Sequence, residues 1–189
     1  MKKLLIAAAL ASTFMATSAF AQGYIGFGLG SATIRGSSST SGAVAVTGGD
    51  TSKGSAKIYG GFQFTPNWGI EGQYSDLGNR DYTVTTAGVV TSRGSARSSQ
   101  YSLAGTGTLP LGSNFALLGK LGVSANRAGY PGSNNKTSLM AGVGVSYSIT
   151  PQLAIRLEYE DFGKFADNNG FGGGSIRGTN TSLNLQYSF

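Results

Sequence analysis

The sequence has no cysteine and no histidine, and it carries little charge. Without cysteine the chain can form no disulfide, thiolate nucleophile or cysteine-linked lipid anchor. Without histidine it lacks the commonest metal ligand and the usual general base of enzymes. Charged residues make up 12% of the sequence, whereas about 25% is usual in soluble domains. The composition therefore disfavours an ordinary soluble domain and most enzyme classes.

No apolar run after the N-terminus is long enough for a membrane-spanning helix. The N-terminus itself begins with Lys2 and Lys3, which precede a short apolar stretch. Ala19-Phe20-Ala21 then has the small-x-small form of a secretory cleavage site. We therefore expect residues 1–21 to be a signal peptide, cleaved near Ala21-Gln22. A transmembrane anchor is the alternative, but the stretch is short and rich in alanine.

Apolar residues alternate with small or polar residues in eight segments, as in half-buried strands. The apolar faces carry almost no charge, and the opposite faces are small and mostly uncharged. Segments of about ten residues suit a tilted strand that crosses a bilayer. The sequence therefore predicts an all-β fold over residues 22–189, an eight-stranded antiparallel up-and-down transmembrane β-barrel. Its strands are expected near residues 24–32, 58–64, 70–75, 101–109, 115–126, 138–149, 153–160 and 182–189.

The connections between these segments alternate between short and long. The short ones contain proline, and the long ones are rich in Gly, Ser, Thr and Asn. Bacterial outer-membrane barrels have short periplasmic turns and longer extracellular loops. The short turns are expected at 65–67, 110–113 and 150–151, and the long loops at 33–53, 79–97, 127–135 and 163–177.

Aromatic residues cluster near the segment ends, which predicts girdles at the two water–lipid boundaries. Strand propensity alone would also enrich aromatic residues, so this signal supports the barrel only together with the alternating connections. The expected girdle residues are Tyr24, Phe64, Trp68, Tyr74, Tyr101, Phe115, Tyr147, Tyr159, Tyr187 and Phe189.

Three stretches resemble the transmembrane domain of outer membrane protein A (OmpA) and its small barrel relatives. Residues 64–72 are similar to the family's second hairpin, and residues 147–159 to its third periplasmic turn and seventh strand. The resemblance implies the outer membrane of a Gram-negative bacterium. OmpA carries a peptidoglycan-binding domain after its barrel, whereas this sequence ends at Phe189, so we expect no cell-wall anchor. The final stretch resembles the signal read by the barrel-assembly machinery, through Leu183, Leu185, Tyr187 and Phe189.

The polar faces carry a few charges that would point into the barrel. OmpA-type barrels are the standard example of an interior just wide enough for side chains to fill. Opposite charges there should pair, because an unpaired buried charge costs several kcal/mol. The expected set is Glu71, Lys120, Arg156 and Glu158, with Glu160 nearer the outer end.

In the OmpA family a matching set of charges is thought to block or gate the channel. Two places where that family often has a charge are Thr106 and Ser146 here, so the network is thinner. We therefore keep a static ion-pair cluster and a functional gate as alternatives.

Most other charges are basic and lie in or beside the long connections. We expect them to contact lipopolysaccharide phosphates, with host polyanions or surface receptors as the alternative ligands. We expect no nucleic-acid partner, because these residues are spread out. We also expect a monomer, since a closed barrel satisfies its own backbone. The basic residues are Arg35, Lys53, Arg80, Arg93, Arg97, Arg127, Lys136, Lys164 and Arg177.

Neither of two weak motifs predicts a bound cofactor or metal. The glycines at 26, 28 and 30 lack the helix of a nucleotide-binding loop, and residues 167–170 lack the glutamate of a calcium loop. Small barrel enzymes that act on lipid or peptide use a histidine, so we expect no enzymatic activity. The sequence predicts a structural or surface-interaction role, such as envelope integrity or adhesion, with a largely plugged lumen. The alternative is a narrow, low-conductance pore for small solutes.

Overall fold

The computed structural model describes residues 22–35, 39–41, 44–47, 51–86, 89–128, 136–167 and 175–189. The predicted signal peptide and its cleavage point after residue 21 lie outside these ranges. The described ranges contain no helix that is long and apolar enough to cross a membrane. The described strands are β1 (Gln22–Arg35), β2 (Ser39–Ser41), β3 (Val44–Thr47), β4 (Thr51–Gln63), β5 (Trp68–Thr86), β6 (Val89–Gly112), β7 (Phe115–Ala128), β8 (Lys136–Ser148), β9 (Leu153–Asp167) and β10 (Ser175–Ser188).

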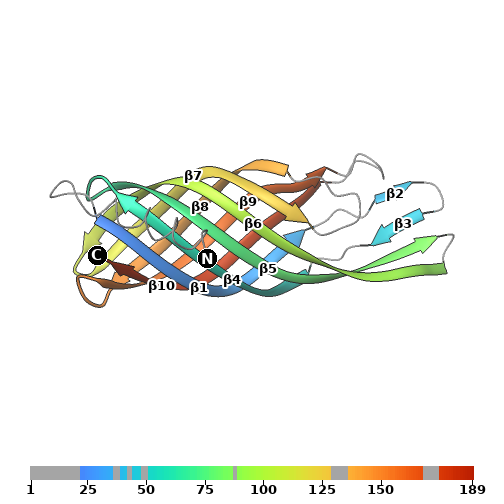
Figure 1. Cartoon of the computed structure of the whole chain (residues 1–189), viewed down its shortest axis with the longest axis horizontal. Helices are drawn as coiled ribbons and strands as arrows, with labels where there is room; N and C mark the ends of the chain where they lie inside the picture. The colour runs from blue at the N-terminus through green and yellow to red at the C-terminus, as the bar shows by residue number, and fades with distance from the viewer. Residues whose placement is uncertain are drawn as a thin grey trace, which may run out of the picture.

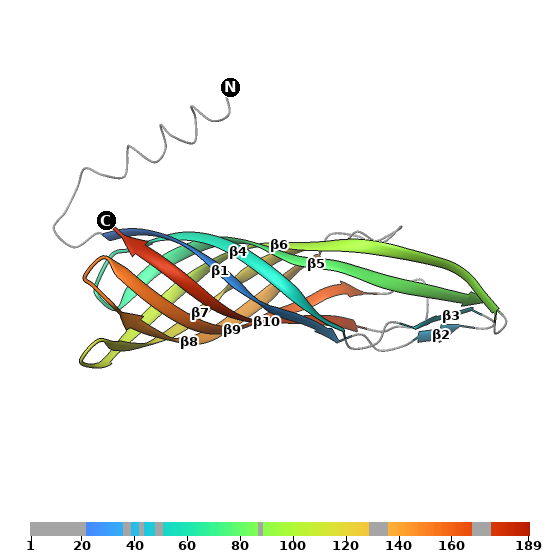
Figure 2. The ribbon, with the colours of Figure 1, turned by 90° about the horizontal axis from the view of Figure 1, so that it is seen from below.

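Eight of these strands, β1 and β4 to β10, form a closed antiparallel barrel (Figures 1 and 2). β1 pairs with both β4 and β10, and the β5–β6 pairing completes the ring. Closure leaves no unpaired strand edge in the hydrocarbon, where each unsatisfied backbone group would be costly. The predicted eight-stranded barrel is therefore confirmed. β2 and β3 form a short ribbon that pairs with β5 beyond one end of the barrel.

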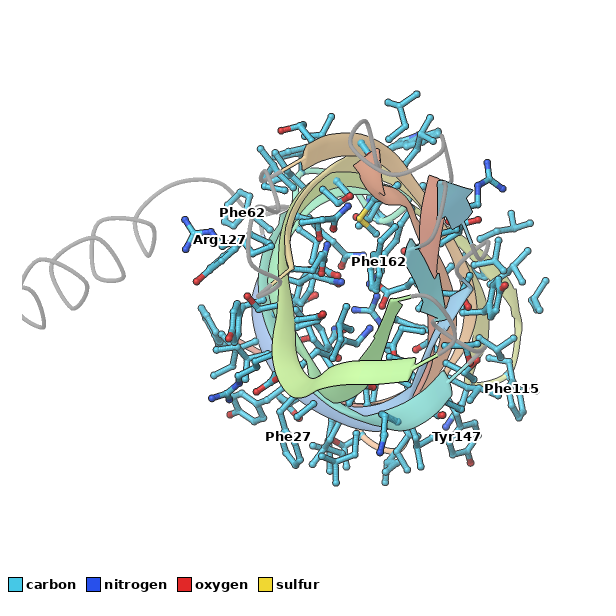
Figure 3. All side chains as sticks on the ribbon, turned by 90° about the vertical axis from the view of Figure 1, so that its right-hand side faces the viewer. Phe27, Phe62, Phe115, Arg127, Tyr147 and Phe162 are labelled. Carbon is cyan, nitrogen blue, oxygen red and sulfur yellow. The ribbon has the colours of Figure 1, made fainter. Side chains whose placement is uncertain are left out.

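The barrel has an apolar exterior and a polar interior, the reverse of a soluble protein. Leu121 and Leu139 on the outside are 69% and 76% exposed, whereas Glu160 on the inside is fully buried. Figure 3 shows Phe27 and Phe115 pointing away from the ring of strands, with Phe162 inside it. The period-two pattern of the sequence thus maps directly onto lipid-facing and lumen-facing positions.

The aromatic girdle is present, but Tyr24 does not belong to it. Tyr24 lies in the lumen and is only 4% exposed, so its assignment to the girdle was wrong. It shares the inward parity of the β1 glycines, which the alternation itself could have shown. Tyr74 is half-buried, and its ring centroid lies 4.9 Å from that of Tyr101. The remaining expected girdle residues are exposed: Phe64, Trp68, Tyr101, Phe115, Tyr147, Tyr159, Tyr187 and Phe189.

Two of the predicted short turns share one construction. The hydroxyl of Thr65 accepts a hydrogen bond from the backbone N–H of Trp68 at 3.0 Å, and Thr150 accepts one from Leu153 at 3.0 Å. In both turns a proline follows the threonine, which fixes the backbone and ends the preceding strand. The third short turn follows Gly112, which has a φ of +97°. All three turns lie at the same end of the barrel as the C-terminus (Figure 2).

The prediction of a long loop over residues 79–97 was wrong. β5 and β6 continue through this stretch as a paired ladder up to Thr86 and Val89, with a register shift between Val84 and Thr85, well beyond the barrel (Figure 1). The stretch is rich in threonine and valine, which favour strands. It lacks an apolar face because it lies outside the hydrocarbon, so the alternation that marks a membrane strand is absent. Residues 33–53 likewise contain strand, including β2 and β3.

A charge placed on the lipid-facing surface should destabilise the barrel. Leu157 of β9 is exposed near the middle of the apolar belt. We expect Leu157→Arg to lower the free energy of unfolding by about 2–4 kcal/mol, the usual cost of arginine near the bilayer centre. The measurement is reversible urea unfolding in lipid vesicles. Thr181→Arg on β10 is the control, since its exposed side chain lies beyond the apolar Leu183. Equal losses in both variants would contradict the membrane orientation.

Candidate functional site in the lumen

The four charges predicted to face the lumen meet there. β5 brings Glu71, β7 brings Lys120, and β9 brings Arg156 and Glu158, all of them buried. The Lys120 ammonium lies 2.5 Å from a Glu71 oxygen and 2.8 Å from a Glu158 oxygen. Arg156 lies 3.1 Å from Glu71 and 2.5 Å from Glu158. Each acid therefore contacts two cations, as expected for charges confined away from water.

Two further charges complete the network. Lys57 of β4 pairs with Glu158 and, at 2.9 Å, with Glu160 of β9. Glu160 also lies 3.2 Å from Lys120. Lys57 was not predicted for this site, because the expected strand began at Ile58. Continuing the alternation by one residue would have placed Lys57 on the inward parity of Tyr59 and Gly61.

The lumen network, as we call it, balances three cations against three anions. Its members are Lys57, Lys120 and Arg156 with Glu71, Glu158 and Glu160, and each is at most 6% exposed. Removing one member would leave an uncompensated buried charge, which typically costs 3–5 kcal/mol. The network links four strands, β4, β5, β7 and β9, across the lumen. Among the described residues, no cluster of acidic side chains is arranged to hold a metal ion.

Two tyrosines form the aromatic part of the same site. The Tyr24 hydroxyl donates a hydrogen bond to Glu71 at 3.0 Å. The Tyr59 ring has three cations near its face: Arg156 at 4.9 Å, with Lys57 and Lys120 each at 5.6 Å. Cation–π attraction is stronger for desolvated groups. Tyr59 thus contributes to cation binding through its ring, while its hydroxyl is buried without a hydrogen-bond partner.

Glycines make room for these two rings. The register sets Tyr24 of β1 opposite Gly61 of β4, and Gly26 of β1 opposite Tyr59 of β4. A Cβ on Gly61 would overlap the Tyr24 hydroxyl, and a Cβ on Gly26 would overlap the Tyr59 ring. Each tyrosine therefore lies across the glycine of the other strand. The two ring centroids are 6.4 Å apart, in an edge-to-face arrangement.

The nine basic residues predicted for the outer rim all lie in strands, not in loops. Arg97 pairs with Asp76 of the neighbouring strand, and the Arg127 guanidinium lies 5.4 Å from the centre of the Tyr101 ring. Four of the nine have exposed side chains: Lys53, Arg97, Arg127 and Arg177. The other five lie in strands described here by their backbone: Arg35, Arg80, Arg93, Lys136 and Lys164.

The residues of the predicted assembly signal lie on the last strand, which closes the barrel. The backbone N–H of Phe189 donates to the carbonyl of Gly23 at 3.0 Å, next to the β1–β10 ladder. Leu183, Tyr187 and Phe189 are exposed on the lipid-facing side, and Leu185 is half-buried. Their recognition by the assembly machinery stays a prediction.

Comparison with known proteins identifies the fold family. A family model described as the outer membrane protein beta-barrel domain matches residues 4–189. No curated protein matches the sequence.

Several solved structures share the barrel. Ail, the attachment invasion locus protein of Yersinia pestis, was solved with the heparin analogue sucrose octasulfate. It is 18% identical, with 88% of this chain and 99% of that chain covered and a TM-score of 0.53. Neisserial surface protein A is 20% identical, with 88% and 97% covered and a TM-score of 0.54. Outer membrane protein AlkL is 11% identical, with 92% and 93% covered and a TM-score of 0.59. At these identities the likeness concerns the fold.

The two lumen tyrosines should respond differently to loss of their hydroxyls. We expect Tyr24→Phe to lower the free energy of unfolding by about 1.5–3 kcal/mol, because it removes a hydrogen bond to a buried carboxylate. Tyr59→Phe should change it by less than about 0.5 kcal/mol, because the ring and its cations are retained. Urea unfolding in lipid vesicles measures both. An equal loss in the two variants would contradict the assigned roles.

A methyl group at Gly61 should disturb the same site. We expect Gly61→Ala to destabilise the barrel by about 1–3 kcal/mol, the usual cost of overpacking a filled interior. Gly119→Ala is the matched control, since a Cβ on Gly119 of β7 meets no atom within 4 Å. Thermal or urea unfolding of both variants in vesicles measures the difference. If Gly119→Ala is as costly as Gly61→Ala, the cost does not arise from contact with Tyr24.

Proposed function

Because the chain belongs to the outer membrane protein β-barrel family, we propose that it is a surface protein with a closed lumen. Its outer end binds anionic groups, with lipopolysaccharide of the surrounding leaflet as the first partner. In this role the barrel is a rigid support for the basic outer ends of its strands. Envelope integrity or adhesion then depends on what those strand ends bind.

The lumen network supports the closed state. Six charged side chains occupy the middle of a barrel whose width is sufficient only for side chains. Their pairing leaves no member of the network without an opposite charge within 3.2 Å. A pore would require several of these pairs to separate together. We therefore assign the network a structural role and place the activity at the outer end.

One row of basic residues carries the proposal of an anionic partner. The register sets Arg35 of β1 opposite Arg177 of β10, and Arg177 opposite Lys164 of β9. Such partners have Cα atoms about 5 Å apart, and like charges directly opposite one another destabilise a sheet. An anion bound from outside offsets that repulsion. Arg177 lies beyond Leu183, the outermost exposed leucine of β10, and so lies outside the hydrocarbon.

This basic row would bind phosphate and sulfate groups in the same way, because both are anions with several oxygen acceptors. Guanidinium and ammonium groups form strong charge-assisted hydrogen bonds with both. Lipopolysaccharide supplies phosphates at the membrane surface, and the Ail structure contains a sulfated heparin analogue. For this chain we propose lipopolysaccharide contact as the main role. Binding of sulfated host polymers is a second candidate, which the same row supports.

We infer that the protein is a monomer in the outer membrane and catalyses no reaction. We also infer that the barrel-assembly machinery recognises the alternating apolar residues of its last strand. Leu183, Leu185, Tyr187 and Phe189 supply that pattern on β10 and at its end.

Neutralising the basic row should weaken binding of anionic ligands. We expect the triple variant Arg35→Gln, Lys164→Gln, Arg177→Gln to bind lipopolysaccharide about 10- to 100-fold more weakly. This follows from roughly 1 kcal/mol for each basic residue near an anionic surface. Titration of the purified protein in nanodiscs with lipopolysaccharide, and separately with heparin, measures the two candidate ligands. Binding should also weaken as salt concentration rises.

A second triple variant removes the same amount of charge from other positions. Lys53→Gln, Arg97→Gln, Arg127→Gln alters three basic residues that do not belong to the row. We expect its affinity to fall less than about threefold, since the row is intact and only long-range attraction is lost. Equal losses in the two triple variants would show that net charge alone attracts the ligand. No lipopolysaccharide binding by the unmodified protein would refute the proposed partner.

A further inference from the structure

Five buried apolar residues form one cluster in the lumen. Four of them lie in its outer half, and the fifth, Ala104, lies opposite Glu71 in the β5–β6 ladder. Leu77, Met140 and Phe162 are at most 1% exposed, and Ala32 is fully buried beside them. Figure 3 shows Phe162 inside the ring of strands. We call these four residues the outer cap. They are not needed to pair the lumen charges.

The two largest residues of the outer cap arise from an internal repeat. Residues 65–78 and 150–163 both begin with Thr-Pro and end with Tyr, Asp and Gly at matching positions. Leu77 of β5 and Phe162 of β9 occupy the same place in the two copies, between the Asp and the Gly. β5 and β9 are four strands apart in either direction around the ring, so they form opposite walls. Two matching positions therefore supply apolar side chains from opposite sides.

Leu77 and Phe162 point inward by the ordinary alternation of their strands, and the same local bend follows each of them. The backbone N–H of Gly78 donates to Asp76 at 3.1 Å, and that of Gly163 donates to Asp161 at 2.8 Å. Both glycines have a left-handed φ, +79° and +68°. The ladder shifts register beside each bend, as in a β-bulge. A glycine is needed there because other residues rarely adopt that conformation.

The outer cap lies further out than the lumen network. Phe162 follows Glu160, the outermost acid of the network on β9, by two residues, which is about 5 Å along the axis of a barrel with tilted strands. Polar residues, including the fully buried Ser75, lie between the two levels. An ion that enters from outside would meet this apolar cluster, with the buried Ser124 and Asn126 that donate hydrogen bonds to the Phe162 carbonyl, before it reaches the paired charges. Apolar constrictions block ions by excluding water.

We propose that the outer cap is a second barrier in series with the lumen network, and that either barrier alone keeps the barrel closed. The proposal rests on the closed lumen proposed above. The two barriers work by different physics. The network fills the lumen with charges that are costly to separate, and the cap excludes water from a polar passage. Loss of one barrier therefore leaves the membrane sealed.

Single-channel recording of four proteins tests the series arrangement. They are the unmodified protein, Glu71→Ala/Lys120→Ala, Leu77→Ala/Phe162→Ala, and the quadruple variant, each purified from outer membranes. The first pair removes one acid and one base, so net charge is unchanged. We expect no openings from the first three proteins and discrete openings from the quadruple variant. Circular dichroism and heat-dependent gel mobility verify folding of each barrel.

Each contrary result would refute a different part of the proposal. Openings in the unmodified protein would refute the closed lumen itself. If Glu71→Ala/Lys120→Ala alone conducts as well as the quadruple variant, the cap is no barrier. Openings in Leu77→Ala/Phe162→Ala would show that the network does not block, and a silent quadruple variant would refute the series model. Phe115→Ala/Leu117→Ala on the lipid-facing side, combined with Glu71→Ala/Lys120→Ala, is the matched control and should be silent.

A thiol placed between the barriers tests the cap where the quadruple variant does not fold. The sequence has no cysteine, so Ser75→Cys introduces a single thiol. We expect it to resist a membrane-impermeant thiol reagent added outside intact cells. It should react at least tenfold faster when combined with Leu77→Ala/Phe162→Ala. Lys53→Cys should react in both backgrounds. Fast labelling of Ser75→Cys with the cap intact would overturn the proposal.

Discussion

The interior of the barrel depends on charge compensation, because its charged side chains are buried. Eight strands enclose little more space than side chains fill, so inward charges must find opposite charges within the protein. Three cations and three anions do so across β4, β5, β7 and β9. Removal of any one would leave its partners as uncompensated buried charges, which cost more than the intact pairs contribute. The intact network therefore contributes to the stability of the barrel, and it limits which residues the neighbouring positions can tolerate.

The sizes of the residues around the network depend on the space that its side chains occupy. Tyr24 and Tyr59 surround the cations with aromatic rings, and the space for those rings exists because Gly61 and Gly26 lie opposite them. The abundance of glycine in the sequence is thus partly explained by the volume that charged and aromatic side chains occupy. In a wider barrel, water could solvate the charges and these glycines would be replaceable. Here the backbone itself forms the wall against which the rings pack.

Alternation predicted most of the barrel because the membrane imposes it on every strand that crosses. It also placed Glu71, Lys120, Arg156 and Glu158 on inward positions, since parity within a strand fixes orientation. It failed where that constraint is absent. Residues 79–97 form strand outside the hydrocarbon, and no apolar face is required there. Lys57 was missed at a strand end, and the inward Tyr24 was assigned to the girdle by residue type instead of parity. Which charges meet across the lumen depends on strand stagger, which period-two patterns do not encode.

The internal repeat shows how one backbone design supports two kinds of closure. Residues 65–78 and 150–163 build the same turn, strand and bend on opposite walls. At one matching position the copies carry opposite charges, Glu71 and Arg156, which pair across the lumen at 3.1 Å. At another they carry Leu77 and Phe162, which lie in one apolar cluster. Matching positions of the two copies face each other across the lumen. Opposite charges at such positions therefore form an ion pair, and apolar residues there form an apolar contact.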